Sequence, residues 1–103
     1  MAKFLITYHG GGEMPADPDV REQMLNAFAA WAAGVGDKMI DPGTPLGPAK
    51  TVTSDGVKDG EPGGVGGYTL LSADSLDDAV ELVRDHPFVS RGGTLRVSEA
   101  VVP

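Results

Sequence analysis

The sequence predicts a small α+β fold, in which two strand–helix–strand units contribute to one antiparallel sheet. Three observations favour this class. Apolar or alternating runs typical of strands occupy residues 3–8, 38–40, 67–72 and 94–97. Two segments with apolar residues at helical spacing lie between them, near 17–35 and 75–84. Glycine and proline gather in the remaining stretches, which we expect to be loops.

In the first unit, Phe4, Ile6 and Tyr8 point to one face of the first strand, and Leu5 and Thr7 to the other. Since both sets are largely apolar, this strand is expected at the centre of the sheet. The next segment is predicted to be a helix, with Asp17 as its N-cap and Pro18 as its first residue. Gly34 and Gly36 are the stop signal. Apolar residues recur along it at helical spacing: Val20, Met24, Ala27, Phe28, Trp31, Ala32 and Val35.

A short second strand is predicted at Lys38–Ile40. Residues 41–48 must be irregular, because three prolines remove the donors that a strand needs. A hairpin arm follows around the Ser54–Asp55–Gly56 turn, since Asp-Gly is a strong turn pair.

In the second unit, residues 67–72 form a strand, with Tyr68 and Leu70 on one face. Ser75 and Asp78 have the spacing of a capping box. Apolar residues at i, i+3, i+4 and i+7 then predict an amphipathic helix: Leu76, Ala79, Val80 and Val83. Pro87 ends the helix and moves His86 out of the helical region, and the last strand covers Thr94–Val97.

Right-handed crossovers place both helices on one face of the sheet, which is the ferredoxin-like βαββαβ arrangement. The length of 103 residues predicts a single domain over 1–103. We expect the other sheet face to be apolar and to be covered by a second copy, so that the protein is a homodimer.

The composition excludes several partners. A net charge of -7, from 8 basic and 15 acidic residues, disfavours nucleic acid and anionic membrane surfaces. The absence of Cys excludes a thiolate site or a disulfide frame. No apolar run approaches the roughly 20 residues of a membrane span, and residues 1–6 lead directly into a strand. By elimination, we expect a cytoplasmic location.

An ordered series of short motifs resembles the YCII-related family, and more closely its DGPF-type branch: Phe4–Tyr8, Val20–Gln23, Pro45–Pro48, Asp59–Pro62, Gly67–Tyr68, Asp85–Pro87 and Gly92–Gly93. The resemblance implies a ferredoxin-like fold that dimerises into an α/β barrel, in a family where a few members are enzymes on small aromatic or related molecules. Compact members often carry a suspected acid–base His where this chain has Met24. The Asp-Gly-Pro-Phe loop reads Asp59-Gly60-Glu61-Pro62 here.

His86 is the first candidate for chemistry, because an imidazole with a pKa near 6.5 can move protons at neutral pH. The structural alternative is that it interacts with carbonyls at the helix end. His9, at the end of the first strand, could contact a ligand or lie in solvent. Asp41 could orient or polarise a partner, or form a turn together with Asp37.

The remaining candidates would line a pocket for a flat ligand, although each could equally serve in the core or at its rim: Tyr8, Met24, Phe28, Trp31 and Tyr68. With two His and no Cys, no metal site is expected. The glycine-rich run at 60–67 precedes a strand, so it is not a phosphate loop.

These observations favour a small dimeric protein that binds a small molecule in a cleft between the sheet and the first helix, without a cofactor. If it is an enzyme, His86 is the predicted general acid or base, Asp41 orients or polarises, and Tyr8, Trp31 and Tyr68 line the pocket. The alternative is a non-catalytic dimeric module that acts through a protein partner or a regulatory ligand, which Met24 in place of His favours.

Overall fold

The computed structural model describes residues 1–10, 15–60 and 64–103. Gly11, Gly12 and residues 61–63, which the sequence assigns to loops and which include part of the Asp59–Pro62 motif, lie outside it. The elements are β1 (Ala2–His9), α1 (Pro18–Val35), the 3-10 turn η1 (Gly36–Lys38), β2 (Met39–Asp41), β3 (Lys50–Thr53), β4 (Gly56–Asp59), β5 (Val65–Ala73), α2 (Leu76–Val83), α3 (Pro87–Ser90) and β6 (Thr94–Ala100).

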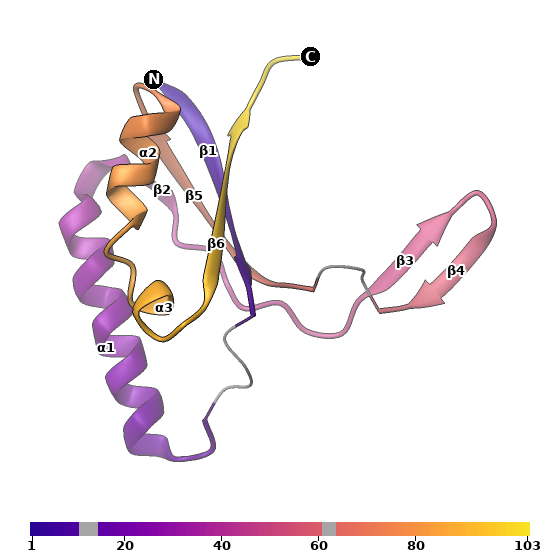
Figure 1. The fold of residues 1–103 in the computed structure, drawn as a ribbon, viewed down its shortest axis with the longest axis horizontal. Coiled ribbons are helices and arrows are strands. Elements are labelled where there is room, and N and C mark those ends of the chain that lie inside the picture. The colour runs from indigo at the N-terminus through magenta and orange to yellow at the C-terminus, as the bar shows by residue number, and fades with distance from the viewer. Residues whose placement is uncertain (11–14, 61–63) are drawn as a thin grey trace.

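The main sheet has the strand order β2-β5-β1-β6, with every neighbouring pair antiparallel. This is the order of a ferredoxin-like fold, and it confirms the α+β prediction. β1 lies between β5 and β6, as its two apolar faces predict. All three helices cover one face of the sheet, and the opposite face is left open (Figure 1).

The residues predicted to begin the two long helices and to end the first make the expected capping contacts. The Asp17 carboxylate accepts the Asp19 N–H at 2.9 Å, Pro18 is the first helical residue, and Gly36 ends α1 with a φ of 67°. Ser75 Oγ accepts the Asp78 N–H at 3.1 Å, which is the N-cap half of the predicted capping box.

Two element predictions need correction. β2 covers Met39–Asp41 and not Lys38–Ile40, because Lys38 still belongs to the 3-10 turn that follows α1. Pro87 does more than stop α2: it opens the short helix α3, where its missing N–H costs nothing.

The core lies between the sheet and the helices. Phe4, Ile6 and Leu71 are fully buried on the covered face. Ile6 and Leu71 form one cluster with Trp31, Val35 and Val83, whereas Phe4 belongs to a second cluster. Trp31 Nε1–H donates to the Leu82 carbonyl at 2.9 Å, so this indole is buried without an unsatisfied donor. The bond also ties α1 to α2.

The open face is less apolar than the sequence predicts. Its middle row holds Leu5, Leu70 and Ser98, which are neighbours across β1, β5 and β6. The rows on either side are polar or mixed: Lys3, Ser72 and Ala100 in one, Thr7, Tyr68 and Arg96 in the other. The difference comes chiefly from β6, which contributes Arg96 and Ser98 to this face.

The hairpin β3–β4 leaves the body of the molecule on the side of the open face (Figure 1). Val52 and Val57 are cross-strand neighbours on it, with 74% and 61% of their surface exposed. We refer to Lys50–Asp59 as the arm. A two-stranded hairpin is marginally stable alone, and this one keeps an apolar valine pair exposed.

Gly43 lies where the chain leaves β2 and passes close to β5. Its φ is 75°, and a methyl group added to it would come within 1.6 Å of the Tyr68 carbonyl oxygen. Only glycine can therefore follow this path, which keeps residues 44–46 against the edge of β5.

We expect Gly43→Ala to lower the free energy of unfolding by roughly 2–4 kcal/mol, from left-handed backbone strain and the clash with Tyr68. Urea denaturation measures this change. Gly47→Ala is the control, because Gly47 has negative-φ backbone and no atom within 4 Å of an added methyl, so its effect should stay within about 0.5 kcal/mol. Equal effects at both positions would contradict the explanation.

Candidate functional site

Five aromatic rings meet between the sheet and the helices, and we call them the aromatic cluster: Tyr8, Phe28, Trp31, His86 and Phe88. His86 is at the centre. Its ring centroid is 4.3 Å from that of Trp31, 5.1 Å from Tyr8 and 5.6 Å from Phe28. These separations are typical of packed aromatic pairs, so the five rings form one closely packed cluster.

His86 is 2% exposed and caps α3 at its N-terminus. Its Nδ1 accepts the Phe88 N–H at 3.0 Å. A neutral imidazole has one acceptor and one donor nitrogen, so Nε2 carries the proton. That nitrogen lies 2.7 Å from the Tyr8 hydroxyl oxygen, to which it donates.

The hydrogen bonds continue from Tyr8 across the sheet. The Tyr8 hydroxyl lies 2.7 Å from Thr69 Oγ1, and Thr69 Oγ1 donates to the Pro42 carbonyl at 2.9 Å. Because a carbonyl only accepts, the Thr69 proton is committed to Pro42 and Tyr8 must donate to Thr69. The chain therefore runs in one direction, from His86 through Tyr8 and Thr69 to the backbone of Pro42.

Burial sets the charge state of this chain. It lowers the pKa of His86 from 6.5 to about 4, with a smaller contribution from the positive charge of Arg91. Burial also raises the pKa of the Tyr8 phenol, partly offset by its hydrogen bond with Thr69. At neutral pH both side chains are uncharged, and both ring nitrogens of His86 are engaged. The geometry therefore holds the Tyr8 hydroxyl in a fixed position and leaves His86 no free nitrogen to act as a base.

The predicted site residues divide between the two faces of the sheet. Tyr8, Trp31 and His86 come together on the helix face. Met24 is half-buried one helical turn before Phe28 on α1, so it lies at the margin of the aromatic cluster.

Tyr68, Asp41 and His9 belong to the open face. Asp41 accepts the Gly43 N–H at 2.8 Å and lies 3.5 Å from the Tyr68 hydroxyl. His9 Nε2 is 2.8 Å from Thr7 Oγ1. The structure thus does not bring Asp41 or Tyr68 to His86, and the single cleft expected from the sequence is two separate groups of residues.

Thr69 and Phe88 take part in the helix-face group, although the sequence did not suggest them. Thr69 alternates with Tyr68 along β5, so period-two reasoning could have placed it beside Ile6, its register partner. Phe88 packs so closely on Gly93 that a methyl group there would come within 2.2 Å of the ring. No sequence signal shows this contact, because it depends on how α3 turns back to β6.

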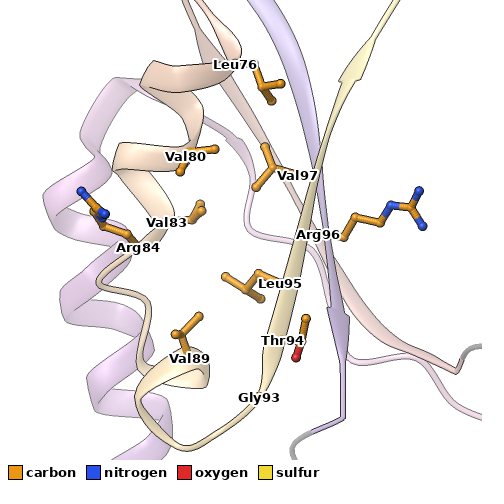
Figure 2. A pocket seen from close by; sticks show the side chains of 10 residues that line it. All are labelled: Leu76, Val80, Val83, Arg84, Val89, Gly93, Thr94, Leu95, Arg96 and Val97. Carbon is orange, nitrogen blue, oxygen red and sulfur yellow. The ribbon is translucent and has the colours of Figure 1, made fainter.

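An apolar groove lies between α2, α3 and the edge strand β6 (Figure 2). Leu95 and Val97 point from β6 towards the helices, whereas Arg96 points to the opposite side of the strand (Figure 2). Leu76, Val80 and Val89 line the groove from the helices and are 46%, 39% and 40% exposed, so a substantial apolar surface stays open in one chain.

Two features are absent from the residues that the structure describes. No three His, Asp or Glu side chains gather there in a way that could hold a metal ion. None of the described helices is long and apolar enough to cross a membrane.

No protein-family model matches this chain, and no curated protein matches it in sequence. A solved structure is similar: 5-chloro-2-hydroxyhydroquinone dehydrochlorinase (TftG) from Burkholderia phenoliruptrix AC1100, in complex with 2,5-dihydroxybenzoquinone. It superposes with a TM-score of 0.59 at 24% identity, over 96% of this chain and 93% of that one. The likeness shows that the two chains share a fold over nearly their whole length.

The buried neutral His86 predicts a specific pH dependence of stability. In the unfolded chain His86 takes up a proton below pH 6.5, whereas in the folded protein it does so only near pH 4. The free energy of unfolding should therefore fall by roughly 3 kcal/mol from this group as the pH drops from 6.5 to 4. Urea denaturation across this range measures it.

Carboxylates also titrate in that window, so the comparison is made with His86→Asn, which keeps a side chain able to cap α3. The gap in stability between the natural chain and His86→Asn should shrink as the pH falls. His9→Gln, which removes the only other His, should keep the full slope. Parallel pH curves for the natural chain and His86→Asn would contradict the assignment.

Proposed function

We propose that this chain is a YCII-related protein that acts as a homodimer and binds a small planar molecule at the margin of the aromatic cluster. The ordered motifs along the chain support the family, and the shared fold with the dehydrochlorinase supports it further. The observation that carries the proposal is the fixed Tyr8 hydroxyl, held between His86 and Thr69 among aromatic rings.

The exposure of the cluster indicates where a ligand would lie. His86 and Trp31 are buried, whereas Tyr8, Phe28, Phe88 and the adjacent Met24 are only half-buried. A flat molecule could therefore cover the half-buried rings and complete their burial. Aromatic pairs gain about 0.5–1.5 kcal/mol beyond the area they bury, which favours a planar ligand over a branched one.

The polar contact comes from Tyr8. Its oxygen accepts one hydrogen bond from His86 and has a second lone pair, so it can accept from a hydroxyl group on a ring. A dihydroxyquinone has this chemistry, and the dehydrochlorinase of the same fold was solved with 2,5-dihydroxybenzoquinone. We therefore assign hydroxylated six-membered rings as the ligand class.

In this proposal His86 is a positioning residue. Its one basic nitrogen, Nδ1, accepts the Phe88 N–H, so His86 would have to give up that hydrogen bond before it could take a proton from a ligand. The Nε2 proton faces Tyr8, so a proton donated by His86 would pass through the Tyr8 hydroxyl. A catalytic contribution from Asp41 would need the open face.

A specific observation also favours the non-catalytic alternative. The groove beside β6 combines exposed apolar side chains with an edge strand, and such surfaces accept polypeptide. Met24 in place of the family His points in the same direction. Both functions are compatible with one dimer, because the groove and the aromatic cluster involve different residues.

We expect isothermal titration with 2,5-dihydroxybenzoquinone to show binding that Tyr8→Phe weakens about 5- to 10-fold, as for one lost hydrogen bond. Phe28→Ala should weaken it further through lost ring contact. Val80→Ala, which trims the groove and not the cluster, is the control and should bind unchanged. Loss of binding in Val80→Ala with full binding in Tyr8→Phe would move the site to the groove. No binding by the natural chain would reject this ligand class.

A further inference from the structure

We infer that the dimer forms around a two-fold axis parallel to the strands, so that Arg96 pairs with Asp41 of the partner subunit and each arm covers the partner's groove. The inference rests on the proposed homodimer and adds its geometry and its contacts. It follows from the charges at the two edges of the open face and from the direction of the arm.

The charges lie at opposite edges of the open face, in adjacent rows. Arg96, Thr7 and Tyr68 are neighbours across β6, β1 and β5. Asp41 on β2 is the register partner of Leu70 in the next row, and its carboxylate lies 3.5 Å from the Tyr68 hydroxyl. β6 and β2 are the two ends of the strand order. Three strand spacings of about 4.8 Å separate them, so Arg96 and Asp41 of one chain are at least roughly 14 Å apart across the sheet. Neither is in an ion pair with another described residue.

Both side chains are on the face that a second copy would cover. Arg96 points away from the groove and the helices (Figure 2). Asp41 is the register partner of Leu70 and hydrogen-bonds Tyr68, both of which belong to the open face. Each charge would need compensation if this face were buried, because an unpaired buried charge is costly.

Two symmetric ways exist to stack two such faces. A two-fold axis across the strands places β6 over β6 of the partner, and at the level of Arg96 it brings this side chain towards a second Arg96. An axis parallel to the strands places β6 over the partner's β2, and it brings Arg96 towards Asp41 of the partner subunit. The second arrangement neutralises both charges and makes two identical ion pairs.

The arm supports the same axis. Its base lies on the β2 side of β5, since Pro45 bridges Gly67 and the Leu46 N–H donates to the Gly66 carbonyl at 3.0 Å. From there it projects on the open-face side (Figure 1). With the axis parallel to the strands, β6 of the partner lies above this edge, so the arm passes alongside it and meets the groove between β6, α2 and α3 of that subunit.

The two surfaces match in chemistry. The arm offers the exposed pair Val52 and Val57, and the groove offers the half-exposed Val80 and Val89. Both are apolar, and each stays open in one chain. Mutual burial would stabilise a hairpin that is otherwise marginal, and it would shield the edge strand β6 from unrelated chains. The second copy is thus the occupant that covers the open face and the groove at once.

A disulfide cross-link tests the contact directly, because the natural chain has no Cys. The double variant Val57→Cys/Val89→Cys changes two exposed positions and should yield a covalent dimer under mild oxidation, seen on a non-reducing gel. Val57→Cys/Ala30→Cys is the matched control, with the second Cys on the exposed surface of α1, and it should stay mostly monomeric on the gel. Each single variant should do the same.

Charge reversal tests the ion pair. By sedimentation velocity, Arg96→Glu should weaken self-association at least tenfold, and Arg21→Glu, an equal charge change on α1, should leave it unchanged. The double reversal Arg96→Glu/Asp41→Arg should recover part of the loss. No effect of Arg96→Glu would overturn the ion pair.

If the natural chain dimerises but the Val57→Cys/Val89→Cys variant forms no cross-link, this arrangement is overturned and the proposed homodimer stands. A natural chain that sediments as a monomer at micromolar concentration would overturn both. The titration with 2,5-dihydroxybenzoquinone is independent of either outcome.

Discussion

The buried imidazole of His86 is the constraint on which the helix face of this protein depends. A histidine at 2% exposure is tolerated only if both ring nitrogens are satisfied and the ring is uncharged. The backbone N–H of Phe88 in the first turn of α3 satisfies one nitrogen, and the Tyr8 hydroxyl on the central strand satisfies the other. These two bonds fix the turn between α2 and α3, the hydroxyl of Tyr8, and through Thr69 the backbone of Pro42 at the far edge of the sheet. One side chain thus ties together the C-terminal unit, β1, β5 and the segment after β2.

The open face depends on a different constraint, the distribution of charge. The sheet carries Arg96 at one edge and Asp41 at the other, and neither forms an ion pair with another residue that the structure describes. The arm adds a second unsatisfied surface on the same side. In the proposed homodimer, one symmetric partner would meet both needs. The open face would then be more specific than an apolar surface of the same size, since a shifted or rotated partner would bring like charges together.

The local signals in the sequence predicted the architecture well. Asp17 and Ser75 cap the helices that their spacing indicated, Gly36 ends α1, and the Asp55–Gly56 turn forms the arm. Such signals act through bonds to the nearest backbone groups, so a short window of sequence contains them. The candidate site was harder. Tyr8 and His86 are 78 residues apart, and Tyr68 differs from Thr69 by one position yet points to the other face of the sheet. Tyr8 and Tyr68 lie on opposite faces because the register pairs Tyr68 with Thr7, and no short stretch of sequence contains that register.

What the sequence by itself determined is the order of strands and helices, their caps and turns, and the covered side of β1, because these follow from local bonding and from the period of the apolar residues. Only the tertiary structure decided which nitrogen of His86 carries a proton, which polar residues share the open face, and that the arm and the two charges lie on the same side. Those features depend on register and on contacts between distant segments, which the packing of the whole chain sets and no short stretch of residues contains.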